Sequence, residues 1–190
     1  NTENVTDMEG MFLNATEFNK DISTWCVNKI KNEPEVFSTN SKLNNIHKPR
    51  WETCPGPEDP VKQENPMRIN IDIDGSSTPF ELYLSGTGYI WIDWGDGSWE
   101  RFQLTENSII SYQHSYTIPG LYEIGIYGQE DNPNQEIYFG SGSEKSEANK
   151  YLRQITSWGD LRLVSLSGAL NSTTGPLEVP EELPSTVTDL

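Results

Sequence analysis

An alternation of apolar and polar residues in the middle of the chain constrains the fold most strongly. In residues 67–74 the sequence Met-Arg-Ile-Asn-Ile-Asp-Ile-Asp places an apolar side chain at every second position. Because the side chains of an extended strand point alternately to its two faces, this spacing predicts a strand with one buried face. Further segments of this kind, separated by turn-forming residues, follow at 80–84, 89–94, 99–104, 108–112, 121–127 and 136–139. Such a series of short strands predicts an antiparallel β-sandwich at residues 66–140.

The segments on either side of this region have a different composition. Residues 1–55 are rich in Asn and Thr with sparse apolar positions, and residues 155–190 return to the same pattern. We interpret residues 56–65 as a Pro-rich linker and residues 141–154 as a polar connector, because such residues favour exposed connections. The chain is therefore expected to be mostly β, with a sandwich between two repeat-like segments.

The two flanking segments also resemble each other. Val5–Phe12 aligns with Leu163–Leu170, and the string Val-Thr-Asp of the first segment returns at residues 187–189. The corresponding leucines Leu166 and Leu190 are 24 residues apart. This spacing lies within the period of about 20–29 residues that leucine-rich repeats have. We expect the C-terminal segment to begin a repeat array, and the array to continue beyond both ends of the chain.

The charge of the chain excludes some partners. The formal net charge is −16, from 13 basic and 29 acidic residues. Such a surface repels phosphate backbones, so we expect no binding to nucleic acid. No apolar run approaches the roughly 18 residues that a membrane-spanning helix needs, so we also expect no insertion into a membrane.

The cysteines and histidines do not indicate a metal centre. Cys26 and Cys54 lie 28 residues apart, and His47 and His114 are distant from each other in sequence. Zinc sites usually have closely spaced Cys and His ligands, and none occur here. From the residues alone, the cysteines form either a disulfide or two buried thiols.

The first segment carries a run of ordered motifs: Asn4-Val5-Thr6-Asp7-Met8, Met11-Phe12, Ala15, Phe18-Asn19, Asp21-Ile22-Ser23 and Trp25. This run resembles the BspA-like leucine-rich repeat of bacterial surface proteins and some phage proteins. The continuation through Cys26 to Trp51 and Cys54-Pro55 resembles the unit that closes such arrays. The resemblance implies surface display and adhesion. Because the cysteine count is even and the protein looks exported, we predict a disulfide between Cys26 and Cys54.

The middle segment carries two motifs in a fixed order. The first is Trp94-Gly95-Asp96-Gly97-Ser98, and the second, after a strand, contains His114, Tyr116, Gly120 and Tyr122. Together they resemble the PKD-type immunoglobulin-like domain. The resemblance implies a β-sandwich that serves as a spacer, or as a module that contacts proteins or glycans, without catalysis. It also implies structural roles for these residues.

Two other interpretations concern aspartates and tryptophans near these motifs. Convergent carboxylates are the ligands that Ca²⁺ prefers, and the candidates are Asp72, Asp74, Asp93 and Asp96. The ligand series of a calcium-binding loop is absent, so we assign these residues to turns and the surface and expect no metal and no cofactor. Exposed aromatic rings can stack on sugars, and the candidates are Trp91 and Trp99.

A non-catalytic function is expected on these grounds. No nucleophile motif accompanies His114, so we assign no catalytic residue. The leading hypothesis is surface adhesion, attachment and display by a modular extracellular protein. Its partner would be a protein or glycan receptor on another surface, or neighbouring copies in an assembly. The alternatives are a phage virion component, such as a capsid decoration or tail-fibre protein, and an accessory glycan-binding module of a secreted enzyme.

Overall fold

The chain folds into two compact units, Asn1–Asp59 and Pro60–Leu190, each with its own hydrophobic core. The computed structural model describes residues 2–56, 59–75, 79–106, 108–140, 150–174 and 176–190. Residues 57–58 of the expected linker and residues 141–149 of the expected connector lie outside these ranges. The described residues include a short 3-10 helix, η1 (Asn45–His47), and Lys150 and Tyr151 also have 3-10 geometry. The prediction of a mostly β protein is confirmed.

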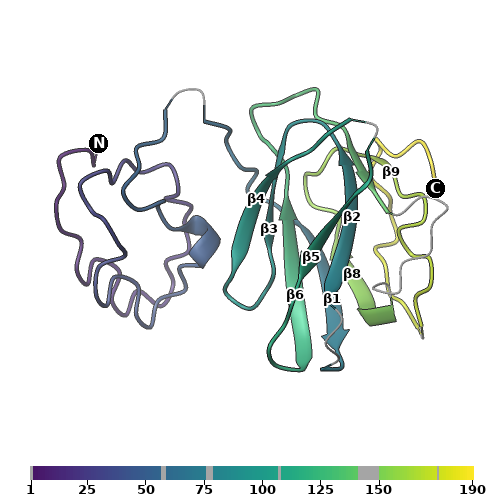
Figure 1. The fold of residues 1–190 in the computed structure, drawn as a ribbon, viewed down its shortest axis with the longest axis horizontal. Helices are drawn as coiled ribbons and strands as arrows, with labels where there is room; N and C mark the ends of the chain where they lie inside the picture. Colours follow the sequence, from purple (N-terminus) through teal and green to yellow (C-terminus); the bar gives the residue numbers. More distant parts are fainter. Residues whose placement is uncertain (1, 57–58, 76–78, 107, 141–149, 175) are drawn as a thin grey trace. The chain divides into compact units, whose positions relative to one another are not determined.

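The first unit winds in successive turns of about 25 residues, and its described residues form no regular strands (Figure 1). Backbone hydrogen bonds join one turn to the next, from Phe12 N to Phe37 O at 2.8 Å and from Ile22 N to His47 O at 2.9 Å. Side chains make bonds over the same separation, as between Lys42 Nζ and Glu17 Oε2 at 2.8 Å. The interval recurs because each turn places its polar backbone groups directly against those of the next.

The interior of the first unit is aromatic and aliphatic. Phe12 stacks on Phe18 with ring centroids 4.3 Å apart, and it meets Phe37 edge-on at 5.3 Å. Each buried side chain of this size contributes roughly 1.5–3 kcal/mol, so a single turn would be unstable without its neighbour. The buried apolar residues of this core are Met8, Ile22, Val27, Ile30, Phe37 and Leu43. A disulfide joins Cys26 to Cys54.

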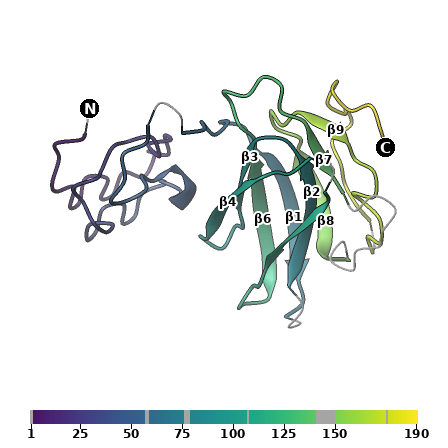
Figure 2. The same ribbon diagram turned by 45° about the horizontal axis from the view of Figure 1, so that its top comes forward.

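The second unit consists of two β-sheets that face each other (Figures 1 and 2). Its strands in the described ranges are β1 (Met67–Ile73), β2 (Phe80–Gly86), β3 (Tyr89–Asp93), β4 (Trp99–Gln103), β5 (Ile110–His114), β6 (Gly120–Tyr127), β7 (Ile137–Phe139), β8 (Leu152–Ser157) and β9 (Leu163–Ser165). One sheet has the order β4-β3-β6-β1-β8 and the other the order β5-β2-β7-β9.

Alternation along the strands builds the core between the sheets. In β1 the residues Met67, Ile69, Ile71 and Ile73 are buried, and the residues between them are partly exposed. The expected sandwich covered residues 66–140, but β8 pairs with β1 and β9 pairs with β7, so the sheets extend beyond that boundary. The pairing of β9 with β7 is parallel, whereas we expected a purely antiparallel sandwich.

Residues 163–174 repeat the backbone geometry of residues 5–16. Met11 N donates to Met8 O at 3.1 Å, and the aligned Ala169 N donates to Leu166 O at 2.9 Å. Two more backbone bonds recur at aligned positions: the bond from Leu13 N to Gly10 O matches that from Asn171 N to Gly168 O, and the bond from Ala15 N to Phe12 O matches that from Thr173 N to Leu170 O. In a third matching pair the backbone N–H donates to a side-chain oxygen, from Glu9 N to Asp7 Oδ1 and from Ser167 N to Ser165 Oγ. The left-handed residues also coincide, with φ of +63° at Gly10 and +73° at Gly168.

The C-terminal segment of the second unit has a 24-residue interval of its own. Ser165 Oγ donates to Asp189 Oδ2 at 2.8 Å, and Ser165 and Asp189 also form a parallel bridge. Gln154 and Glu178 form a second parallel bridge over the same separation. An apolar cavity of about 320 Å³ opens beside this segment, lined by Trp158, Leu166, Gly168, Ala169, Leu170, Asn171, Val179, Leu183 and Leu190.

Removal of the disulfide should destabilise the first unit alone. For the double variant Cys26→Ala, Cys54→Ala we expect a loss of about 3–4 kcal/mol, because the bond restricts a 28-residue loop in the unfolded chain. Hydrogen exchange with mass spectrometry should show faster exchange in residues 2–53 and unchanged exchange in β1 and β6. The control pair Lys20→Ala, Lys31→Ala changes exposed positions of the same unit. Unchanged protection in the cysteine variant would contradict the prediction.

Candidate functional site

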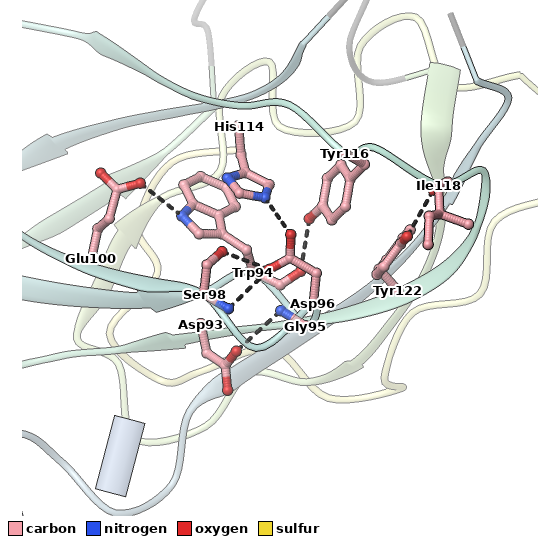
Figure 3. A network of polar contacts seen from close by, with 10 residues as sticks. All are labelled: Asp93, Trp94, Gly95, Asp96, Ser98, Glu100, His114, Tyr116, Ile118 and Tyr122. Atoms are coloured by element: carbon pink, nitrogen blue, oxygen red, sulfur yellow. Dashed lines mark hydrogen bonds and ion pairs between the residues drawn. The ribbon is translucent and has the colours of Figure 1, made fainter. Parts of the chain in front are cut away.

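The turn between β3 and β4 holds the first of the two sequence motifs (Figure 3). Trp94 N donates to Ser98 O at 3.1 Å, and this bond closes the turn. Asp93 Oδ1 accepts a hydrogen bond from Gly95 N at 3.0 Å. Gly95 has a φ of +81°, and a Cβ at this position would lie 2.4 Å from the carbonyl oxygen of Glu123 in β6. Glycine is therefore required here both by conformation and by space.

The Asp96 carboxylate links this turn to β5. Its Oδ1 accepts bonds from the backbone N–H of Ser98 at 3.0 Å and from the Ser98 hydroxyl, and its Oδ2 lies 2.8 Å from His114 Nε2. Burial acts to raise the pKa of Asp96. The hydrogen bonds from Ser98 and His114, together with the charge of His114, outweigh burial and hold the pKa below its usual value.

Three aromatic rings pack next to this carboxylate. The Trp94 indole is fully buried and stacks on the His114 imidazole, with centroids 4.8 Å apart and planes 9° apart. Tyr116 meets the other side of the imidazole edge-on at 4.6 Å and donates its hydroxyl to Trp94 O at 2.8 Å. Burial, followed by the charge of Asp96, raises the pKa of Tyr116 far above its usual range, so the hydroxyl stays a donor.

The remaining motif residues extend the same network (Figure 3). Tyr122 packs against Tyr116 with centroids 4.2 Å apart and donates to Ile118 O at 2.7 Å. Gly120 begins β6, and Gly97 has a φ of +92° in the turn. The structure thus brings the two motifs together in one contiguous cluster that spans both sheets.

Glu100 also belongs to this cluster, although the sequence motifs did not predict it. Trp94 Nε1 donates to Glu100 Oε1 at 3.3 Å. Glu100 lies in β4 opposite Ile92 of β3. The hairpin register after the Asp-Gly turn places Glu100 across from β3, and this register was the signal that could have identified it.

The geometry of the cluster differs from that of a nucleophilic site. In such a site the serine hydroxyl bonds to the imidazole, and the carboxylate orients the imidazole from its other side. Here the Asp96 carboxylate lies between the Ser98 hydroxyl and His114. The hydroxyl therefore donates to an acceptor that cannot take up its proton at neutral pH. The arrangement links the turn after β3 to the end of β5 through hydrogen bonds.

The four aspartates of the calcium interpretation do not converge. Asp72 forms an ion pair with Arg153 at 3.6 Å, and Asp74 accepts a bond from the Tyr151 hydroxyl at 3.3 Å. These two lie at the end of β1, whereas the other two flank the turn after β3, and β6 separates β1 from β3. In the described part of the chain, no three His, Cys, Asp or Glu side chains are grouped to hold a metal ion.

The two tryptophans proposed to stack on sugars differ in exposure. Trp91 is only 6% exposed, so its ring offers no face to a ligand, and the expectation for this residue is wrong. Alternation along β3 places Trp91 on the face opposite Trp94, and alternation alone does not show what covers that face. Trp99 is partly exposed at the start of the edge strand β4.

Comparisons with known proteins match one part of the chain. Residues 1–56 match a family described as "Mycoplasma protein of unknown function, DUF285". No curated protein and no solved structure matches the chain. Across the described ranges, no helix has the length and apolar character needed to cross a membrane.

Loss of the Asp96 charge should lower stability in a pH-dependent way. Because the folded pKa of Asp96 is depressed, its stabilising contribution is present above the unfolded pKa of about 3.9 and disappears as the pH falls through the folded pKa. For Asp96→Asn we expect a loss of about 1–2 kcal/mol at pH 7, and a difference from the parent chain that shrinks as the pH falls below about 3.9 and through the folded pKa of Asp96. Denaturant unfolding across this range is the measurement. The control Glu130→Gln removes an exposed charge, and a pH-independent difference for Asp96→Asn would contradict the prediction.

The fold should be independent of metal ions. The candidate aspartates already bond to protein groups in the turn and to side chains of β8 and its surroundings. Thermal unfolding in EDTA should match unfolding in buffer of equal ionic strength. A decrease of many degrees that Ca²⁺ restores and Mg²⁺ does not would overturn this expectation.

Proposed function

We propose that this chain is a non-catalytic adhesion and display segment of a modular extracellular protein. The repeat-like coils form a platform, and the sandwich is a spacer or a receptor-facing module. Its partner is a protein or glycan on another surface. The observation that carries the proposal is the recurrence of one backbone hydrogen-bond pattern at residues 5–16 and 163–174, on either side of the first seven strands.

The first unit is proposed to be a BspA-like leucine-rich repeat coil with its closing unit. Its turns of about 25 residues and its apolar interior agree with that class, and the residues after Leu163 would begin a further array. The uncovered apolar cavity at Leu166, Leu170 and Leu190 supports this view, because stacked coils bury such surfaces against a neighbouring coil.

The sandwich of the second unit is proposed to be PKD-like. Support comes from the position of both motifs in one network, in which the turn, the imidazole and the Tyr116 hydroxyl stabilise one another. The proposed role of these residues is structural. A module of this kind holds other segments at a distance from a surface, or presents its loops and sheet faces to a partner.

The disulfide supports an extracellular location. Disulfides persist in oxidising compartments and are rare in the cytosol, and the bond between Cys26 and Cys54 closes the first unit. The virion hypothesis remains the second candidate, because the open apolar cavity of the C-terminal segment would also serve assembly. We prefer a cellular surface because the family that residues 1–56 match is described as a Mycoplasma protein.

Binding and turnover assays on the purified chain test the proposal together. The immobilised chain should bind at least one member of a panel of extracellular-matrix proteins, glycans and cultured cells in a saturable manner. Panels of peptide, ester and glycosidic substrates should show no turnover. The contradicting result is a turnover that the folded variants His114→Ala and Asp96→Asn abolish while Glu130→Gln retains it. Circular dichroism verifies that each variant is folded.

A further inference from the structure

A groove lies on the second unit where β2, β7 and the β4–β5 loop meet. It has a volume of about 470 Å³ and is lined by Ser85, Gly86, Thr87, Glu106, Ile109, Glu136 and Tyr138. This volume is within the range of about 300–1,000 Å³ that small-ligand sites have. The groove is separate from the turn after β3, and none of its residues belongs to the two motifs.

Two carboxylates in the groove are available as hydrogen-bond acceptors. Glu106 and Glu136 are both exposed, and neither forms an ion pair within the described ranges. The Tyr138 hydroxyl donates to Glu136 Oε2 at 3.1 Å. This hydrogen bond raises the pKa of Tyr138, and slight burial and the charges of Glu136 and Glu106 raise it further. Both carboxylates therefore raise the pKa of the same residue, Tyr138.

A largely buried serine forms part of the groove wall and provides an independent sign of a ligand. Ser85 is only 7% exposed, yet it lines the groove. In the part of the chain that the structure describes, no hydrogen bond joins its hydroxyl to another residue. The Ser85 oxygen is not among the fully buried unpaired side-chain atoms of the described residues, so it is accessible from the groove and lacks a protein partner there. A ligand hydroxyl in the groove would supply a partner.

Apolar surface accompanies these polar groups. Tyr138 is 37% exposed and Ile109 is 52% exposed, and both line the groove. Gly86 allows the close approach of β2 and β7 that forms this part of the wall, because a Cβ there would lie 1.9 Å from Glu136 O. The groove thus combines apolar side chains, hydroxyls and uncompensated carboxylates at one place.

We propose that this groove binds a neutral, hydroxyl-rich sugar unit of a glycan receptor. Vicinal sugar hydroxyls donate to Glu106 and Glu136, a further hydroxyl bonds to Ser85, and the C–H face of the sugar ring packs on Tyr138 and Ile109. This inference rests on the proposed adhesive function and names the class of receptor. It replaces Trp91 and Trp99 as the site of sugar contact.

The charge of the groove selects against acidic glycans. Two uncompensated carboxylates line it, and the whole chain carries a net charge of −16. Sialylated or sulfated sugars would place a like charge close to Glu106 and Glu136, which is unfavourable. Neutral sugars experience no such repulsion and use the carboxylates as acceptors.

A glycan array probed with the full chain tests the inference. The array pairs neutral oligosaccharides with their sialylated and sulfated forms, and isothermal titration follows each positive result. We expect binding to neutral members only. Tyr138→Ala and the pair Glu106→Gln, Glu136→Gln should each weaken binding about tenfold or more, the effect of losing an anchor residue. Trp99→Ala, a partly exposed aromatic on the edge strand β4, should leave the affinity unchanged.

Three results would overturn the inference: no bound glycan, binding confined to acidic glycans, or loss of binding in Trp99→Ala but not in Tyr138→Ala. A lysine-rich peptide on the same array reports simple charge attraction. Binding of this peptide alone also contradicts a sugar site. If the chain binds matrix proteins or cells but no glycan, the groove assignment fails and the adhesive function stands. If it binds nothing on either panel, both fail.

Discussion

The bond between the Asp96 carboxylate and the His114 imidazole is the interaction on which the geometry of the second unit depends. Asp96 lies in the turn after β3, in the five-stranded sheet, and His114 ends β5, in the four-stranded sheet. The bond therefore connects the two layers at one end of the sandwich. The imidazole that it fixes is also the surface on which Trp94 stacks. This side-chain contact of 2.8 Å thus ties the turn after β3 to β5 beside Trp94, the largest fully buried side chain of the described residues.

Much of this arrangement could be predicted from the sequence, because local patterns report local structure. Alternation located β1 through β7 to within a few residues, and the order of the two motifs indicated that Trp94, Asp96 and His114 act together. The contact itself could not be predicted without the resemblance, because Asp96 and His114 are 18 residues apart and lie on different sheets. The repeat alignment of Val5–Phe12 with Leu163–Leu170 matched positions that share hydrogen bonds, since equal spacing of small and apolar residues produces equal turns.

Other features were beyond sequence reasoning for physical reasons. The buried residues of β8 do not alternate regularly with exposed ones, and its register with β1 shifts twice. The sequence therefore lacks the alternation that would have predicted this strand. Strand β9 has only three residues and is defined by its parallel partner β7. Trp91 was assigned to the correct strand, but its ring is buried instead of exposed. Alternation shows to which face of the strand a side chain points, and it does not show what packs on that face. The groove at Ser85 and Tyr138 is formed by β2, β7 and a loop, which are distant in sequence.

A double-mutant cycle between Asp96 and His114 tests most directly the claim that this contact is structural and joins the two sheets. The single variants Asp96→Asn and His114→Gln and the double variant are unfolded in denaturant at pH 7. The structure predicts a coupling energy of about 1–2 kcal/mol, because the double variant loses a contact that each single variant has already removed. Additive effects within about 0.3–0.5 kcal/mol would contradict this view, since residues without direct interaction behave in that way.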